Sequence, residues 1–219
     1  MNKLWQFGLL LWLGAVSISA FLWAPLAQGL GEYTRVLYFH VPVAWVTVLA
    51  FLIGAVFSVL FLMKRKFLYD QIAEAASQLG LIYCILATVT GSIWAKVSWG
   101  SFWNWDPRET SIFILLLIYA AYFALRSAIE HEERRAVLGA VYSIFAFVTV
   151  PFFVLIVPRV YSSLHPDPLI NTQAKINMDG KMLTTFLSSL FGFTVLFLWM
   201  LKSKIALVKI KLRLREMEN

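Results

Sequence analysis

The segment WAKVSWGSFWNWDPRET, residues 94–110, separates two apolar segments that are each long enough to cross a bilayer. Four of the nine tryptophans of the chain lie in it, at Trp94, Trp99, Trp103 and Trp105. Interfacial tryptophan is common in membrane proteins, but it is normally spread over many helix ends. Closely spaced indoles beside a basic residue favour a flat apolar shelf with a cation at its edge. Such a shelf suits a large planar ligand with acidic groups, and a plain interfacial belt is the alternative.

The end of the same segment predicts the start of a helix. Asp106, Pro107 and Glu109 have the residue types and spacing of an N-cap, a first-turn proline and the acid of a capping box. We therefore expect Asp106 to cap the helix that follows, with the aromatic residues lying directly before its first turn.

Composition assigns the chain to the integral membrane proteins. Hydrophobic residues make up 60% of the chain and charged residues only 14%, whereas charged residues are about a quarter of a soluble domain. A membrane-spanning helix takes about 20 apolar residues. We expect an all-α polytopic membrane protein, a single domain over residues 1–219, with six spanning helices at 5–24, 43–63, 73–95, 107–126, 137–157 and 182–201.

The basic residues predict the orientation of the helices. Of the 19 lysines and arginines, 13 fall in the termini and loops of one side and 6 on the other. The positive-inside rule then places both termini in the cytoplasm and loops 25–42, 96–106 and 158–181 outside. Loop 96–106 contains most of the Trp-rich segment. Residues 202–219 are predicted to be a basic cytoplasmic tail that contacts anionic lipid.

Two of the three histidines are candidate metal ligands. His131 lies in a charged cytoplasmic run and is expected to be solvated, whereas His40 and His165 fall in two outside loops. A lone histidine is usually a hydrogen-bonded structural residue, but two beside an aromatic shelf can hold haem iron from both faces. Pro42 and Pro166 follow them closely and restrict the backbone there. Cys84 has no second cysteine to pair with, and we expect it to pack in the apolar interior.

The sequence WGSFWNWDPRET resembles the "WWD" signature of haem-handling proteins in cytochrome c maturation, and the whole layout is similar to the CcmC family. FHVPVAW around His40 and SSLHP around His165 match the two histidine loops of that family. Phe102 and the ending DPRET depart from its usual pattern and lean toward the larger CcsA proteins. The resemblance implies transient binding of haem b, with His40 and His165 as axial ligands. The remaining predicted haem-binding residues are Trp99, Gly100, Trp103, Trp105, Asp106 and Arg108.

No hydrolytic or redox centre is visible in the sequence, so we expect a haem-binding and transfer protein of the cell inner membrane and not an enzyme. The resemblance implies that the protein would present haem outside the cytoplasm and pass it to a membrane-tethered haem chaperone, beside ABC transporter subunits. The haem propionates would need cations, for which Arg108 is the first candidate and Lys96, Arg35 and Arg159 are others. The alternatives are a CcsA-type cytochrome c synthase component, a b-type electron-transfer cytochrome and a small-molecule permease subunit.

Overall fold

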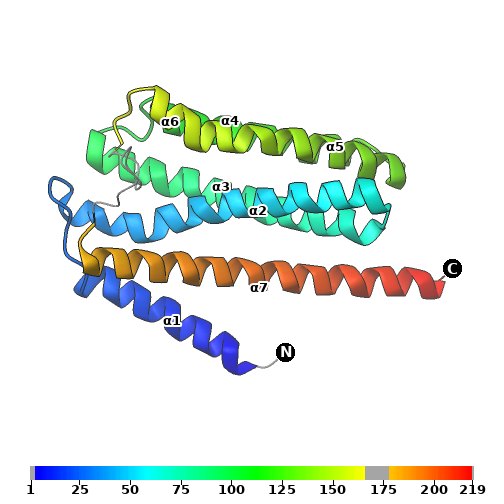
Figure 1. The fold of residues 1–219 in the computed structure, drawn as a ribbon, viewed down its shortest axis with the longest axis horizontal. Helices are drawn as coiled ribbons and strands as arrows, with labels where there is room; N and C mark the ends of the chain where they lie inside the picture. The colour runs from blue at the N-terminus through cyan, green and yellow to red at the C-terminus, as the bar shows by residue number, and fades with distance from the viewer. Residues whose placement is uncertain (1–2, 166–177, 219) are drawn as a thin grey trace.

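The computed structural model describes residues 3–165 and 178–218, which fold almost entirely into helices (Figure 1). The long helices are α1 (Lys3–Leu22), α2 (Leu37–Lys64), α3 (Phe67–Trp99), α4 (Pro107–Ser127), α5 (Glu132–Pro151) and α7 (Gly180–Glu218). Three short elements join them: the 3-10 helix η1 (Gly31–Val36), the π-helix η2 (Phe152–Ile156) and α6 (Val157–Val160). Six helical segments are long and apolar enough to cross a membrane, which confirms the predicted fold class.

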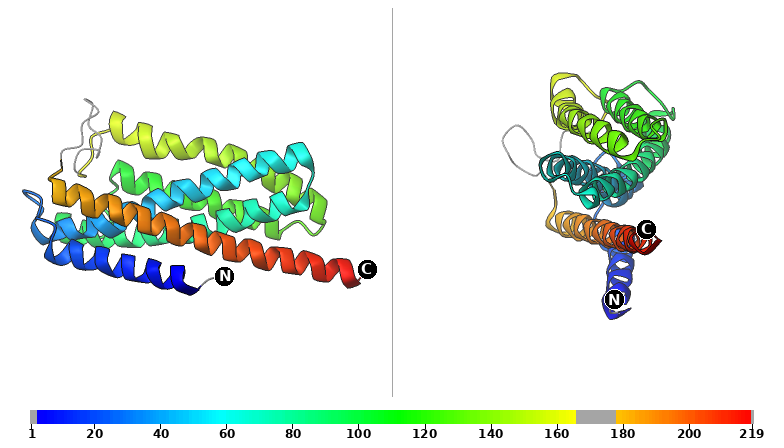
Figure 2. Two further views of the ribbon diagram at one scale, coloured as in Figure 1. Left: turned by 60° about the horizontal axis from the view of Figure 1, so that its bottom comes forward. Right: turned by 90° about the vertical axis from the view of Figure 1, so that its right-hand side faces the viewer.

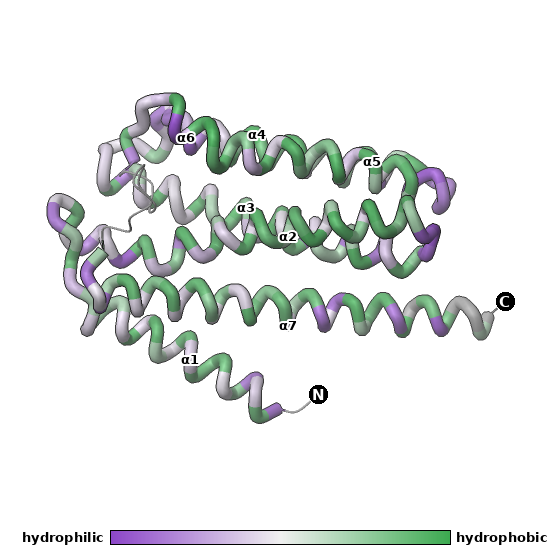
Figure 3. Tube along the Cα trace, in the orientation of Figure 1, coloured by the Kyte–Doolittle hydropathy of each residue, from purple (hydrophilic) through white to green (hydrophobic). Residues whose placement is uncertain are grey.

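Successive helices run in opposite directions, so alternate connections gather at the same end of the bundle. The α1–α2 and α3–α4 connections, the end of α6 and the start of α7 lie at one end, and the α2–α3 turn, the α4–α5 turn and the C-terminus lie at the other (Figures 1 and 2). We call the first of these the histidine end. The helices are apolar along their middle, and the hydrophilic residues concentrate at the turns and along the end of α7 (Figure 3).

The helix α2 lies at the centre and packs against α3, α5 and α7. One buried cluster joins α2, α3 and α7 around Val46, Leu79 and Phe197, and a second joins α2, α3, α4 and α5 around Phe51 and Tyr119. Helix α1 lies on the outside against α7 (Figure 2). The histidine end is therefore supported by a packed core to which α2, α3, α4, α5 and α7 contribute.

The start of α2 differs from the prediction and places His40 in a helix. We expected a loop up to Pro42, but α2 begins at Leu37, so His40 lies in its first turn. A proline inside a helix leaves the carbonyl four residues earlier without its usual donor. Here the Ser189 hydroxyl of α7 donates to that carbonyl, on Tyr38. The contact across helices allows the helix to continue through Pro42.

Three other helix ends also lie away from the predicted positions. Helix α3 runs to Trp99, and Gly100 ends it in the left-handed conformation at φ 85°, so the loop before α4 covers only residues 100–106. Helix α7 is 39 residues long and continues through most of the basic tail. Pro151 ends the regular part of α5 before the predicted end at residue 157, and the π-helix η2 follows directly.

A buried ion pair joins α3 and α4 at the end opposite the histidines. Arg126 makes two hydrogen bonds to Asp70, at 2.7 and 3.0 Å, and one to Glu74 at 2.9 Å. The side chains of Arg126 and Asp70 are only 4% and 2% exposed. Nothing in the sequence analysis predicted this pair, because its two members are 56 positions apart.

Candidate functional site

The loop before α4 is closed by the predicted capping box. The Asp106 carboxylate accepts a hydrogen bond from the Arg108 N–H at 2.9 Å, and Glu109 Oε2 accepts one from the Asp106 N–H at 3.3 Å. Glu109 Oε2 also accepts the Asn104 N–H at 2.7 Å. These bonds satisfy free N–H groups at the helix start and confirm Asp106 as the N-cap.

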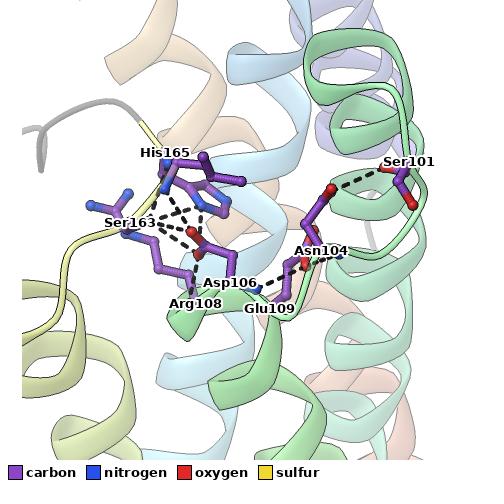
Figure 4. Close-up of polar contacts among 8 residues, drawn as sticks. Ser101, Asn104, Asp106, Arg108, Glu109, Ser163 and His165 are labelled. Atoms are coloured by element: carbon purple, nitrogen blue, oxygen red, sulfur yellow. Dashed lines mark hydrogen bonds and ion pairs between the residues drawn. The ribbon is translucent and has the colours of Figure 1, made fainter.

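The same carboxylate also holds the segment that carries His165 (Figure 4). Asp106 accepts hydrogen bonds from the Ser163 hydroxyl at 2.8 Å and from the Leu164 N–H at 2.7 Å. His165 Nδ1 lies 2.9 Å from Asp106 Oδ1. The side chain of Asp106 is 1% exposed. One buried carboxylate thus joins the start of α4 to the segment after α6.

The pKa values of this pair favour an ionised Asp106 beside a neutral His165. Burial alone would raise the pKa of Asp106, but the hydrogen bonds from the Arg108 N–H, the Leu164 N–H and Ser163 together hold that pKa below its ordinary value. Burial lowers the pKa of His165, and the charge of Arg108 adds to the effect, against the opposing influence of Asp106. A neutral His165 therefore donates Nδ1–H to Asp106, which leaves the Nε2 lone pair available to a ligand.

His40 has its Nδ1 atom held in a comparable way by Thr90 of α3. His40 Nδ1 lies 2.9 Å from the Thr90 hydroxyl oxygen. The Thr90 hydroxyl has one hydrogen, which it donates to the Leu86 carbonyl at 2.7 Å. With that hydrogen engaged, we assign Thr90 as the acceptor from His40 Nδ1–H, which leaves the lone pair of His40 on Nε2.

Helix α3 brings the two histidines to the same place. His40 packs on Gly91, where an added Cβ would lie only 2.9 Å from His40 Cε1. His165 packs on Trp94 and Trp99, with ring centroids 5.7 and 4.7 Å away. Gly91 and Trp94 are three residues apart and share one face of the helix.

The tryptophans of the motif fall into two groups around this site. Trp99 packs edge-on against Trp94 at 4.9 Å and against His165. Trp103 packs on Trp105 and Phe113, with centroids 5.9 and 5.8 Å apart. Trp105 is 74% exposed, and its φ of 55° is uncommon for a bulky side chain. The backbone thus holds one indole out from the protein directly before the cap.

The four candidate cations differ in their surroundings. Lys96 donates to the Gly100 carbonyl at 2.9 Å, Arg159 to the Leu155 carbonyl at 2.6 Å, and Arg35 to Glu32 at 2.6 Å. Arg108 extends toward the segment of Ser163 and His165 (Figure 4), where its charge acts on the imidazole. Of the four, Arg108 is therefore the cation that the structure brings to His165.

The sequence alone did not indicate a functional role for four residues of this site: Thr90, Gly91, Trp94 and Ser163. Trp94 had been assigned only to the motif as a whole. In residues 3–165 and 178–218 no three His, Cys, Asp or Glu side chains gather into a site for a bare metal ion. His131, the third histidine, is exposed and its Nδ1 accepts a hydrogen bond from the Arg134 N–H.

Comparison with known proteins places the chain in a family. The sequence model of CcmC, heme exporter protein C, matches residues 2–218. The heme exporter protein C of Haemophilus influenzae is 30% identical over 203 residues, covering 91% of this chain and 81% of the relative. The protein of that name from Escherichia coli is 28% identical over 179 residues, covering 82% and 71%.

Other relatives are matched over a smaller part of their length. The heme exporter protein C of Rhodobacter capsulatus is 35% identical over 136 residues, which are 60% of this chain and 56% of the relative. The match to the family model nevertheless covers nearly the whole chain, and it agrees with the resemblance carried by the Trp-rich motif and the two histidine segments. The chain belongs to the CcmC family, that of heme exporter protein C.

Proposed function

We propose that this protein binds haem as cargo between His40 and His165 and presents it for transfer during maturation of c-type cytochromes. Its relatives are named heme exporter protein C, and one from Marchantia polymorpha is named a ccmC-like cytochrome c biosynthesis protein. The work proposed is binding, exposure and transfer of haem, without enzymatic chemistry.

The observation that carries the proposal is that both imidazoles are protonated on Nδ1 and not on Nε2. Thr90 and Asp106 each accept a hydrogen bond from Nδ1–H of one histidine, so both Nε2 atoms keep their lone pairs. Haem iron already has four porphyrin nitrogens and needs only axial ligands, for which imidazole is a common choice. Two histidines that pack against one face of α3 and keep the lone pairs on Nε2 fit that requirement.

The aromatic residues and Arg108 fit the rest of a haem molecule. Trp94 and Trp99 lie against His165 and supply apolar surface beside the proposed ligand. Trp103 and Trp105 form a second aromatic group directly before the cap, and Trp105 is largely exposed. Arg108 is the cation best placed to bind a propionate by a charge-assisted hydrogen bond. Gly100, as the left-handed end of α3, supports this arrangement by turning the chain into the loop.

We expect one edge of the bound haem to stay open at this end of the bundle, which suits delivery to a partner. The partner implied by the family resemblance is a membrane-tethered haem chaperone, with ABC transporter subunits in the same assembly. The basic asymmetry of the loops supports cytoplasmic termini and an extracytoplasmic histidine end in the inner membrane.

Cysteine labelling tests the orientation. In a Cys84→Ser background, Ser101→Cys and Ser163→Cys should react with a membrane-impermeant maleimide added to intact cells after removal of any outer barrier. A cysteine at Arg65, in the α2–α3 turn, should react only after the membrane is opened. Labelling of the Arg65 position alone in intact cells would contradict the orientation.

Optical spectroscopy tests haem binding. The purified full-length protein loaded with haem should give a six-coordinate low-spin spectrum. His40→Ala and His165→Ala should each lose haem or change to a different coordination state, and exogenous imidazole should restore binding. His131→Ala is the matched control and should keep the parental spectrum. Parental spectra from both His40→Ala and His165→Ala would refute the ligand assignment.

A further inference from the structure

The two histidines are held by hydrogen-bond acceptors of different strength. His165 donates Nδ1–H to the ionised carboxylate of Asp106, whose side chain is almost fully buried. His40 donates Nδ1–H to the neutral hydroxyl of Thr90. Both bonds are 2.9 Å long, so the chemical difference lies in the charge of the acceptor and not in the distance.

Neither acceptor is free to turn away from its histidine. The Asp106 carboxylate is also fixed by the Arg108 N–H, the Leu164 N–H and the Ser163 hydroxyl. The Thr90 hydroxyl is fixed by its bond to the Leu86 carbonyl. The difference between the two histidines is therefore built into the fold.

A carboxylate that accepts Nδ1–H makes the other ring nitrogen a stronger electron donor. A hydrogen bond to an ionised acceptor is about twice as strong as one between neutral groups. Nε2 of His165 should therefore bind iron more strongly than Nε2 of His40. Two axial ligands of unequal strength give a carrier one bond that holds its cargo and one that breaks first.

We propose that His165 is the retaining ligand and His40 the releasing ligand, with Asp106 and Thr90 as the positioning residues that make them unequal. This inference rests on the proposed function and adds the order in which the bonds to iron break. In the exchange, the lone pair that binds iron returns to Nε2 of His40, and a donor atom of the incoming partner supplies a lone pair in its place. No electron or proton needs to move.

Carbon monoxide is a suitable probe, because it replaces the weaker axial ligand of ferrous haem and reports on the ligand that remains. The full-length protein loaded with haem and reduced would be exposed to carbon monoxide, and the carbon–oxygen stretching frequency would be recorded. Asp106→Asn should shift this frequency, because it removes the charge behind the retained His165 while keeping a good N-cap. It should also weaken haem retention about 10- to 100-fold.

Thr90→Val should leave the stretching frequency of the carbon monoxide complex at the parental value, because His40 has already been displaced there. Without carbon monoxide, the same variant should alter the bis-histidine spectrum, and Thr90→Ser should restore it. Thr88→Val is the matched control, because Thr88 makes the same kind of bond to a backbone carbonyl of α3, at 2.9 Å to Cys84, with no histidine. It should match the parent in both states.

The outcomes separate this inference from the proposed function. A parent protein without a bis-histidine spectrum refutes both. A bis-histidine parent in which Thr90→Val shifts the carbon monoxide band, or in which Asp106→Asn does not, refutes the unequal roles and leaves haem binding in place.

Discussion

Replacing Asp106 with alanine should cost more stability than losing an ordinary helix cap. Loss of an N-cap side chain costs about 0.5 to 2 kcal/mol. Asp106 also accepts bonds from Ser163 and from the Leu164 N–H, and hydrogen bonds to a charged group are worth about 1.5 to 3 kcal/mol each when buried. Leu164 is 57% exposed, so water replaces part of that bond. The cap and the Ser163 bond together give an expected loss of about 2 to 5 kcal/mol, to which the Leu164 bond adds a smaller part.

The assay is equilibrium unfolding of the haem-free protein in detergent, followed by helix content. Asp106→Asn keeps one acceptor oxygen for the cap but replaces the other carboxylate oxygen with an NH2 donor. It therefore loses the charge and one acceptor, and it should cost about 1 to 2 kcal/mol. Asp179→Ala is the matched control, because Asp179 accepts the Lys181 N–H at 2.8 Å near the start of α7 and is exposed. That variant should lose only the cap contribution.

Equal losses for Asp106→Ala and Asp179→Ala would refute the reasoning. They would mean that the bonds from the His165 segment to Asp106 contribute nothing to stability. If Asp106→Ala were as stable as the parent but failed to bind haem, Asp106 would act only on the ligand and not as a structural link.

Three further predictions follow from the packing and charges. Gly91→Ala should weaken haem retention about tenfold, because the added Cβ would lie 2.9 Å from the His40 imidazole and displace it. Gly14→Ala, whose added Cβ would have no atom within 4 Å, should match the parent. Arg126→Ala should cost about 3 to 5 kcal/mol in unfolding experiments, because it leaves Asp70 buried without its partner. Arg135→Ala, whose pair with Glu132 is partly exposed, should cost less than about 1 kcal/mol, and equal losses would contradict this. The haem-free protein should lose stability as the pH falls below 6.5, the ordinary pKa of histidine. The unfolded chain then binds a proton at His165, whereas the folded protein does not, because folding lowers the pKa of His165. His165→Gln should make stability depend less on pH, and an unchanged pH dependence would contradict this.

The spanning helices and the cap of α4 could be predicted because their signals are local. A run of apolar residues must cross the bilayer as a helix whatever surrounds it, and Asp106 and Glu109 satisfy N–H groups only a few positions away. The placement of His165 outside the helices followed from the same reasoning. These features depend on residues that are neighbours in the sequence.

The ends of α2 and the partners of the histidines depend on contacts between distant residues. Pro42 indicated a loop, but the carbonyl it leaves without a donor is bonded by Ser189, which is 151 positions from Tyr38. Thr90 is one of several helix threonines in the sequence, and only the packing of α2 on α3 brings its hydroxyl to His40, 50 positions away. Composition and spacing carry no information about such pairs.

The central claim is that two histidines of this chain bind the same iron, and nitrogen-15 labelling tests it directly. The chain has only three histidines, so a His131→Gln protein with labelled histidine contains just the two proposed ligands. Electron–nuclear double resonance of its ferric haem complex should show two labelled axial nitrogens, and one after either His40 or His165 is replaced and the empty position filled with unlabelled imidazole. A single labelled nitrogen in the protein with both histidines, or none, would contradict the account.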